Sequence, residues 1–201
     1  MSGPRVDVDR LLVGVSGSIA VLNLPTYLVA LRATFAAEVR VIMTGGAARL
    51  LPPSTVALLC DEVLLDEGPA VQRTSGHIEL ANWADMFLVL PASANTLGQV
   101  ANGLAHNLLT TTVLASRTPV VFCPNLNRTM WSKKAVQRNL RTLEEDGHLV
   151  VEPERAPAYE IGTGEMADTL VLPEPDVLVR QLRGMLPQID GTTEGRQQEV
   201  P

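Results

Sequence analysis

Residues 11–35 read LLVGVSGSIAVLNLPTYLVALRATF, and the pattern of apolar and small residues in this segment indicates the fold class. The apolar run Leu11–Val15 predicts a short buried strand, and the glycines and serines at 14–18 predict a turn. Residues 19–35 have helical composition, with Pro25 as the point where the helix kinks or restarts. A strand, a turn and a helix in this order form the repeating unit of α/β proteins.

The same stretch carries no charge from Leu11 to Leu31, a length also found in transmembrane helices and near that of signal peptides. Two observations argue against both readings. Asp7 and Asp9 precede the run, where a signal peptide has positive charge, and Gly, Ser, Asn and Pro residues interrupt it. We therefore expect no association with a membrane.

Strands and helices alternate along the rest of the chain. Further strands are predicted at 38–43, 62–65, 86–90, 119–123 and 149–152, and helices at 47–51, 54–59, 77–84, 96–102, 107–115, 129–146 and 176–186. The run MFLVL at 86–90 is typical of a parallel strand buried on both faces. The order predicts a three-layer, Rossmann-like (flavodoxin-like) α/β fold with a doubly wound parallel sheet.

The chain has 201 residues, which suits a single sizeable domain. We place this domain at residues 10–187, between a flexible N-terminus (1–9) and a flexible C-terminal tail (188–201), because both ends are polar and lack apolar periodicity. No element is predicted over 153–173. A loop of this length inside a compact domain is usually functional or disordered.

Charge and cysteine content exclude several classes of function. Lys and Arg number 16 against 22 Asp and Glu, a net charge of −6 with no dense basic run, so neither nucleic acid nor an anionic membrane is an expected partner. Cys60 and Cys123 are too few and too far apart for a disulfide framework or a CxxC metal site. We predict no metal, a reducing compartment and hence a cytoplasmic location.

Small and hydroxylated residues follow three of the predicted strands, at the edge where open parallel sheets bind ligands. They are Ser16, Gly17 and Ser18, then Thr44, and after MFLVL Ser93, Ala94, Asn95 and Thr96. Helix starts with free N–H groups favour a phosphate, although Ser and Thr also cap helices without any ligand. The P-loop lysine and the GxGxxG spacing are absent, so a mononucleotide such as FMN fits better than ATP, and FAD stays open.

Four segments together resemble the homo-oligomeric flavin-containing cysteine decarboxylases, over about residues 11–187. They are GVSGSIA (14–20), SGHIELANWAD (75–85), PASANT (91–96) and PNLNRTMW (124–131). That family contains phosphopantothenoylcysteine decarboxylases and the epidermin-type peptidyl-cysteine decarboxylases of lanthipeptide biosynthesis, with flavin prenyltransferases as distant relatives. The resemblance implies FMN, a Rossmann-like subunit and a homo-trimer, with a dodecamer as a further level of assembly that the sequence leaves open.

The resemblance also implies roles for individual residues. A histidine placed as His77 is the active-site base of the family, and an asparagine placed as Asn127 binds the substrate carboxylate. The segment Ala156–Asp168 corresponds to a clamp that closes over the substrate. The clamp residues expected to act are Gly162, Thr163 and Gly164, as its mobile part, and Tyr159, Ile161 and Met166, as contacts to a peptide.

These residue types suit the chemistry. Oxidation of a C-terminal cysteine to a thioaldehyde sends a hydride to the flavin and releases a proton, and histidine titrates near the working pH. Loss of CO₂ then leaves an enethiol. The Asn127 amide would donate hydrogen bonds to the carboxylate without a fixed charge that resists its departure.

We predict the epidermin-type reaction, in which the C-terminal cysteine of a lanthipeptide precursor peptide becomes an aminoenethiol that leads to S-aminovinyl-cysteine. The coenzyme A pathway members resemble one another in having a cysteine in the clamp, and this clamp has none. A phosphopantothenoylcysteine decarboxylase and a non-catalytic flavin-binding regulatory protein stay open as alternatives. His77 together with PNLNRTMW argues against a flavin prenyltransferase.

Two positions depart from the family pattern. Leu126 stands where relatives have Met, and His106 stands where many have Asp. The sequence does not say what either change does, nor which precursor peptide is the substrate. His148 follows Gly147 and is expected at the surface.

Overall fold

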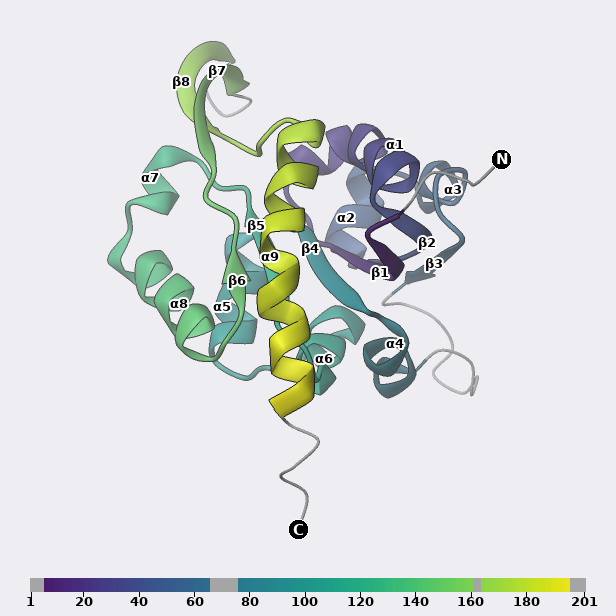
Figure 1. Ribbon diagram of the computed structural model, residues 1–201. Coiled ribbons are helices and arrows are strands. Elements are labelled where there is room, and N and C mark those ends of the chain that lie inside the picture. The colour runs from purple at the N-terminus through teal and green to yellow at the C-terminus, as the bar shows by residue number, and fades with distance from the viewer. Residues whose placement is uncertain (1–5, 66–75, 161–163, 196–201) are drawn as a thin grey trace.

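The computed structural model describes residues 6–65, 76–160 and 164–195. Its centre is a six-stranded parallel sheet in the order β3-β2-β1-β4-β5-β6 (Figure 1). The strands are β1 Val8–Val15, β2 Ala36–Met43, β3 Glu62–Leu65, β4 Met86–Ala92, β5 Val120–Pro124 and β6 Leu149–Val150. The predicted doubly wound fold is confirmed, and the order is that of Rossmann folds rather than the order of flavodoxin, so the topological switch point lies between β1 and β4.

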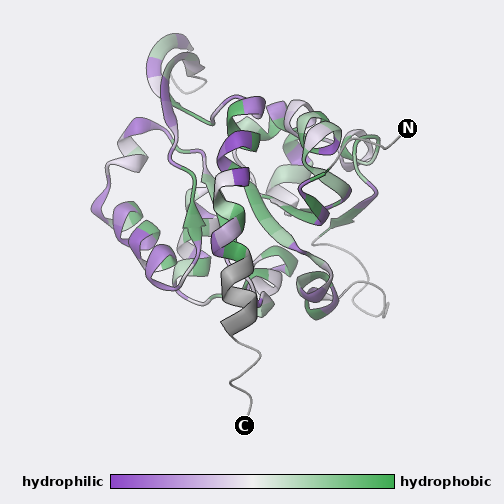
Figure 2. Ribbon diagram, in the orientation of Figure 1, coloured by the Kyte–Doolittle hydropathy of each residue, from purple (hydrophilic) through white to green (hydrophobic). Residues whose placement is uncertain are grey.

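Helices cover both faces of the sheet, and each face has its own apolar core. Side chains alternate along the strands, so Leu11 and Val13 enter one core and Leu12 enters the other. The first core is shared with α1 Leu24–Thr34, α2 Gly45–Leu50, α3 Pro53–Val56 and α9 Pro175–Gly195, and the second with α4 His77–Trp83, α5 Ala94–Ala101, α6 Leu108–Ala115 and α8 Lys134–Glu145. Figure 2 shows the resulting hydrophobic strands between helices with mixed surfaces.

The first predicted helix restarts near Pro25, as one of the two expectations had it. Residues Ile19–Asn23 form a short 3₁₀ helix, η1, and α1 follows with Pro25 in its first turn. Proline is tolerated there because the first N–H groups of a helix have no intrahelical partner.

The single helix predicted over 129–146 is wrong. Two helices occupy this region, α7 Arg128–Trp131 and α8. Lys133 between them has an extended backbone, with φ −68° and ψ 132°. Gln137 Nε2 donates a hydrogen bond to the Trp131 carbonyl at 2.8 Å. A side chain thus satisfies a carbonyl that a continuous helix would have used.

The absence of an element over 153–173 is also wrong, because these residues contain an antiparallel hairpin. Its strands are β7 Glu154–Glu160 and β8 Glu165–Val171, which pair only with each other. In Figure 1 the hairpin stands beyond the edge of the main sheet. Tyr159 lies opposite Met166, and both side chains are about two-thirds exposed, at 63% and 66%.

The limits of the fold differ from the predicted flexible ends, 1–9 and 188–201. β1 begins at Val8, and Arg183 Nε donates to the Asp7 carboxylate at 2.8 Å. α9 continues to Gly195, with Ile189 only 1% exposed. The apolar stripe of α9 therefore extends past Leu186. In the part of the chain that the structure describes, no helix is long and apolar enough to span a membrane.

Candidate active site

Hydrogen bonds join the loops that follow β1, β4 and β5 at the carboxyl edge of the sheet. Ser16 Oγ accepts the backbone N–H of Ser93 at 2.7 Å and donates to the Pro91 carbonyl at 2.8 Å. Ser18 Oγ donates to Oδ1 of Asn125 at 2.5 Å. Ser16 is 1% exposed, so its hydroxyl holds the loops after β1 and β4 together from the protein interior.

The loop after β2 joins the same edge through a contact between two glycines. A Cβ placed on Gly17 would lie 3.0 Å from the backbone of Gly46, a distance that forces one loop to move. Thr44, two residues before Gly46, is buried and accepts the Ala47 N–H at 3.3 Å as the N-cap of α2. The predicted residues after β1 and β2 are therefore neighbours.

The segment after β4 forms the first turn of α5. Ser93 is the N-cap, and its Oγ accepts the Thr96 N–H at 3.3 Å. Thr96 is buried, whereas Asn95 is exposed and accepts a hydrogen bond from Gln99. Helix capping, the alternative to phosphate binding, is therefore present at Thr44 and Ser93, and phosphate binding stays a prediction.

A groove of about 860 Å³ opens at this edge, between the three loops, η1, α1 and the β7–β8 hairpin. Small-molecule sites have volumes of roughly 300–1,000 Å³. The predicted site residues on its wall are Gly17, Ser18, Ser93, Ala94, Asn127 and Tyr159. Ser16, Thr44, Asn95, Thr96, Gly164 and Met166 are not on this wall, and Ile161, Gly162 and Thr163 lie outside the described residues.

The groove has apolar walls that sequence reasoning missed. Ile19, Leu22 and Met130 line it and are 45%, 50% and 40% exposed. Exposed large apolar side chains around a concavity are typical of a binding site. Among the described lining residues the only charged side chain is that of Glu174, so the groove offers hydrogen-bond donors but no cation.

Asn127 lies on the groove wall as the N-cap of α7. Its Oδ1 accepts the Met130 N–H at 2.8 Å. A backbone N–H can only donate, so the amide oxygen must face the helix. The Nδ2 group of Asn127 is then the part of the amide left to donate to a ligand.

His77 does not lie on the groove wall. It is the partly buried first residue of α4, which packs against α6. The Arg40 guanidinium lies 4.2 Å from the ring centroid of Trp83 at the other end of α4. Figure 1 places α4 far from the β7–β8 hairpin. The described residues of one chain therefore do not bring His77 and Asn127 together.

The two departures from the family pattern have different surroundings. Leu126 is 6% exposed and packs in the core that contains Phe122, so an apolar residue of this size fits there. His106 is exposed and is absent from the groove wall. The next residue, Asn107, caps α6 by accepting the Thr110 N–H at 2.9 Å.

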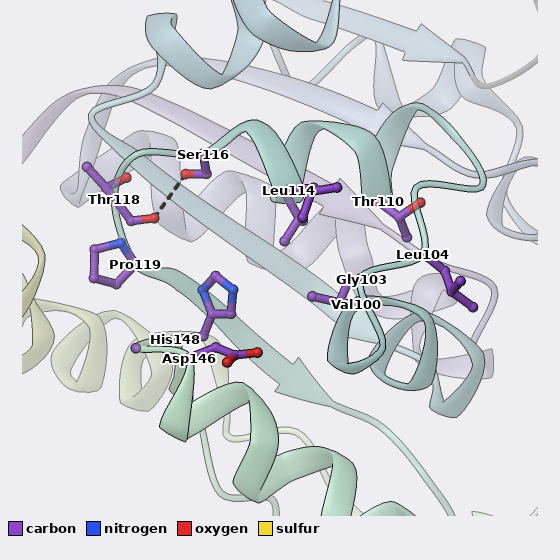
Figure 3. Close-up of a pocket in the computed structure, with 12 residues that line it drawn as sticks. Val100, Gly103, Leu104, Thr110, Leu114, Ser116, Thr118, Pro119, Asp146 and His148 are labelled. Atoms are coloured by element: carbon purple, nitrogen blue, oxygen red, sulfur yellow. Dashed lines mark hydrogen bonds between the residues drawn. The ribbon is translucent and has the colours of Figure 1, made fainter. Parts of the chain in front are cut away.

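A second cavity, of about 330 Å³, lies at the opposite edge of the sheet, beside Thr118 and Pro119 that precede β5 (Figure 3). His148 lines it, half-buried, and its Nδ1 accepts the Val120 N–H at 3.2 Å. Burial lowers the pKa of His148. The expected surface position of His148 is therefore wrong, and none of the predicted site residues lines this cavity.

Both cysteines are poor nucleophiles in this fold. Burial raises the pKa of the Cys60 thiol to about 11, and it raises the pKa of the fully buried Cys123 thiol further. Thiols with raised pKa values stay protonated at neutral pH. Within the described ranges, no group of three or more His, Cys, Asp or Glu residues could hold a metal ion.

Comparison with known proteins identifies the family of this chain. Residues 5–173 match the family described as Flavoprotein. Mersacidin decarboxylase of Bacillus sp. (strain HIL-Y85/54728) is 44% identical over 167 residues, which are 83% of this chain and 85% of that protein. The coenzyme A biosynthesis bifunctional protein CoaBC of Bacillus subtilis (strain 168) is 41% identical over 149 residues, which are 72% of this chain but only 36% of that protein.

Solved structures of cysteine decarboxylases superpose on this fold. EpiD in complex with the substrate peptide DSYTC superposes with a TM-score of 0.79 at 27% identity, over 87% of this chain and 98% of that chain. The FMN-dependent cysteine decarboxylase SpaF superposes with a TM-score of 0.72 at 34% identity, over 90% of this chain and 97% of that chain.

Proposed function

This chain belongs to the flavoprotein family, and we propose that it is a flavin-dependent oxidative decarboxylase acting on the C-terminal cysteine of a lanthipeptide precursor peptide. The product is an aminoenethiol that leads to S-aminovinyl-cysteine. The observation that carries this proposal is the groove, which combines the Asn127 amide, apolar walls and a hairpin at one edge of the sheet. The likeness to mersacidin decarboxylase, and to EpiD with its cysteine-terminated peptide, supports it.

The proposed cofactor is FMN, held by the loops after β1, β2 and β4, and the FMN-dependent relative SpaF supports this choice over FAD. The residues fit such a group. Gly17 and Gly46 leave backbone uncovered by side chains, and Ile19 and Leu22 offer apolar surface to a ring. The proposed contacts are Ser16, Gly17, Ser18, Thr44, Ser93, Ala94, Asn95 and Thr96. When bound, the flavin supplies the oxidant that accepts a hydride from the cysteine side chain.

The protein's own side chains orient the peptide and move the proton. Nδ2 of Asn127 donates to the terminal carboxylate and holds it in place until CO₂ leaves. His77 accepts the proton released by oxidation and so acts as the general base. Tyr159 and Met166 of the hairpin contact the last side chains of the peptide, and the same role is proposed for Ile161, which lies outside the described residues.

Assembly reconciles the position of His77 with this role. His77 is outside the groove of its own chain, yet it is only partly buried and its neighbours Gly76 and Ile78 are exposed, so the start of α4 can contact the groove of an adjacent copy. We therefore propose a homo-trimer in which each groove is completed by His77 of the adjacent subunit, with a dodecamer as a further level of assembly. We also propose a cytoplasmic location, because two free cysteines fit a reducing compartment.

Mass spectrometry of cysteine-terminated peptides tests the proposal, starting with DSYTC and with the absorbance spectrum of the purified protein as the measure of bound flavin. Loss of CO₂ and two hydrogens from the peptide is the expected result. Loss of CO₂ alone from phosphopantothenoylcysteine would assign the chain to the coenzyme A branch, which the likeness to CoaBC keeps as the second candidate. A yellow protein inert on both would favour a regulatory flavoprotein.

A further inference from the structure

We propose that Asn125 is a second amide donor to the C-terminal carboxylate of the substrate, beside Asn127. This inference rests on the proposed function and adds a residue that decides substrate specificity. Asn125 lies on the groove wall, immediately after β5. The two amides would bind the carboxylate through one oxygen each.

The local backbone places both amides on the same side. Side chains alternate between the two sides of an extended segment, so residues two apart share a side. Leu126, between the two asparagines, is 6% exposed and packs in the core. Asn125, Leu126 and Asn127 all line the groove, Leu126 with the small part of its surface that is exposed. Because most of Leu126 is packed in the core, it anchors the segment that carries the two amides.

Hydrogen bonds also fix which atom of each amide faces the groove. Ser18 Oγ donates to Oδ1 of Asn125 at 2.5 Å and lies 3.3 Å from the Asn125 carbonyl oxygen. Met130 N–H donates to Oδ1 of Asn127 at 2.8 Å. In the described part of the chain, neither Nδ2 group has a hydrogen-bond acceptor at bonding distance. Each amide thus has its oxygen occupied and its N–H₂ group left for a ligand.

The charges around the groove leave the two amides as the groups that would bind a carboxylate. No Lys or Arg belongs to its described lining, and Glu174 would repel an anion. The two N–H₂ groups are thus the donors that these residues offer. A C-terminal carboxamide keeps one acceptor oxygen but has an N–H₂ group in place of the other, so one of the two donors would face N–H instead of an acceptor. The pair should therefore select a free carboxylate over a carboxamide.

The substitution Asn125→Asp tests the role, because it keeps an acceptor for Ser18 and replaces the N–H₂ group by a charged oxygen. The probes are two unreactive peptides, DSYTS with a free C-terminus and its C-terminal amide, bound to the flavin-loaded protein and measured by calorimetry. We expect wild type to prefer the acid at least about tenfold, and the variant to lose most of that preference, as for removal of one hydrogen bond to a charged group. Flavin content and melting temperature should not change.

A matched control is Asn102→Asp, the same change on an exposed residue at the end of α5 and away from the groove wall. This control should keep the wild-type preference. A wild-type protein without preference for the acid overturns the inference, as does an Asn125→Asp protein that keeps it. Loss of flavin with an unchanged preference would assign Asn125 to the cofactor and also overturn it. The binding ratio needs no turnover, so it is judged separately from the peptide conversion that tests the proposed function.

Discussion

Gly17 and Gly46 lie in backbone contact, so that a Cβ on Gly17 would be 3.0 Å from both the Cα and the carbonyl carbon of Gly46. Real Cβ atoms essentially never come closer than this. The loops after β1 and β2 therefore approach each other at a point where neither has a side chain. This approach brings Ser18 and Thr44 to one edge of the sheet, where the flavin is proposed to bind.

Gly17→Ala should therefore separate the two loops and lower flavin content well below one per chain, while the rest of the fold is kept. The ratio of flavin absorbance to protein absorbance in the purified protein measures the flavin content. Gly184→Ala is the control, because Gly184 is exposed in α9 with open space around its Cβ position. It should retain flavin and gain up to about 1 kcal/mol of stability. Full flavin content in Gly17→Ala would contradict the proposed cofactor site.

His77→Asn should abolish peptide decarboxylation and leave flavin content unchanged, because His77 lies away from the loops that hold the cofactor. A decarboxylation rate equal to wild type would contradict the proton-transfer role.

The same variant tests assembly, when its subunits are mixed and reassembled with Asn127→Asp subunits. If each groove combines Asn127 of its own subunit with His77 of the adjacent subunit, half of the subunits supply an intact Asn127 and half supply an intact His77. About a quarter of the grooves should then contain both residues and be active. No recovery on mixing would argue that both residues act within one chain.

Asn127 has a capping role and a proposed binding role, and two substitutions separate them. Asn127→Asp keeps an acceptor for the Met130 N–H, so the stability of the protein should change little. Asn127→Ala removes the cap and should lower the free energy of unfolding by about 1 kcal/mol. Both should lose peptide turnover, since neither retains the N–H₂ donor. Denaturant unfolding and peptide kinetics measured side by side check this, and normal turnover in either variant would remove Asn127 from the carboxylate site.

Tyr27 supports the base of the hairpin, because its hydroxyl donates to the Pro173 carbonyl at 2.9 Å. Burial, with a smaller effect from Glu174, raises the pKa of Tyr27 to about 12 from 10.0. A pKa raised by folding means that Tyr27 stabilises the fold fully below pH 10 and loses that contribution as pH rises to 12. Tyr27→Phe lacks this titration. The difference in unfolding free energy between wild type and Tyr27→Phe should thus shrink by about 1 kcal/mol from pH 9 to pH 11. A constant difference would contradict it.

Cys60 should be dispensable for the reaction. Its thiol is half-buried with a pKa of about 11, so only about one molecule in a thousand carries a thiolate at pH 8. Cys60→Ser is therefore expected to keep wild-type kinetics and product. Reaction of the native protein with iodoacetamide should be far slower than that of the unfolded protein, followed by mass spectrometry. A Cys60→Ser protein that stops at a different product would require a thiol in the mechanism.

Some elements of this fold are predictable from the sequence and others are not. The strand at 86–90 was recognisable because a continuous apolar run has few alternatives in an α/β chain. The β7–β8 hairpin was not, since Glu154–Glu160 and Glu165–Val171 lack the apolar alternation of a half-buried strand and pair only with each other. The helix over 129–146 was predicted whole because Ser132 and Lys133 are compatible with a helix, and only the surrounding contacts end α7 there.

Apolar periodicity and short motifs are local properties of the chain, so they were sufficient to predict the doubly wound fold, the hydroxylated loops at its carboxyl edge and the family. Three relationships become visible only in the folded chain: Ser18 meets Asn125, 107 residues later, both amides of the Asn125–Asn127 segment lie on one groove, and His77 lies outside it. These relationships depend on the packing of elements distant in sequence, where a turn of a helix or a buried Leu126 decides which way a neighbouring side chain points.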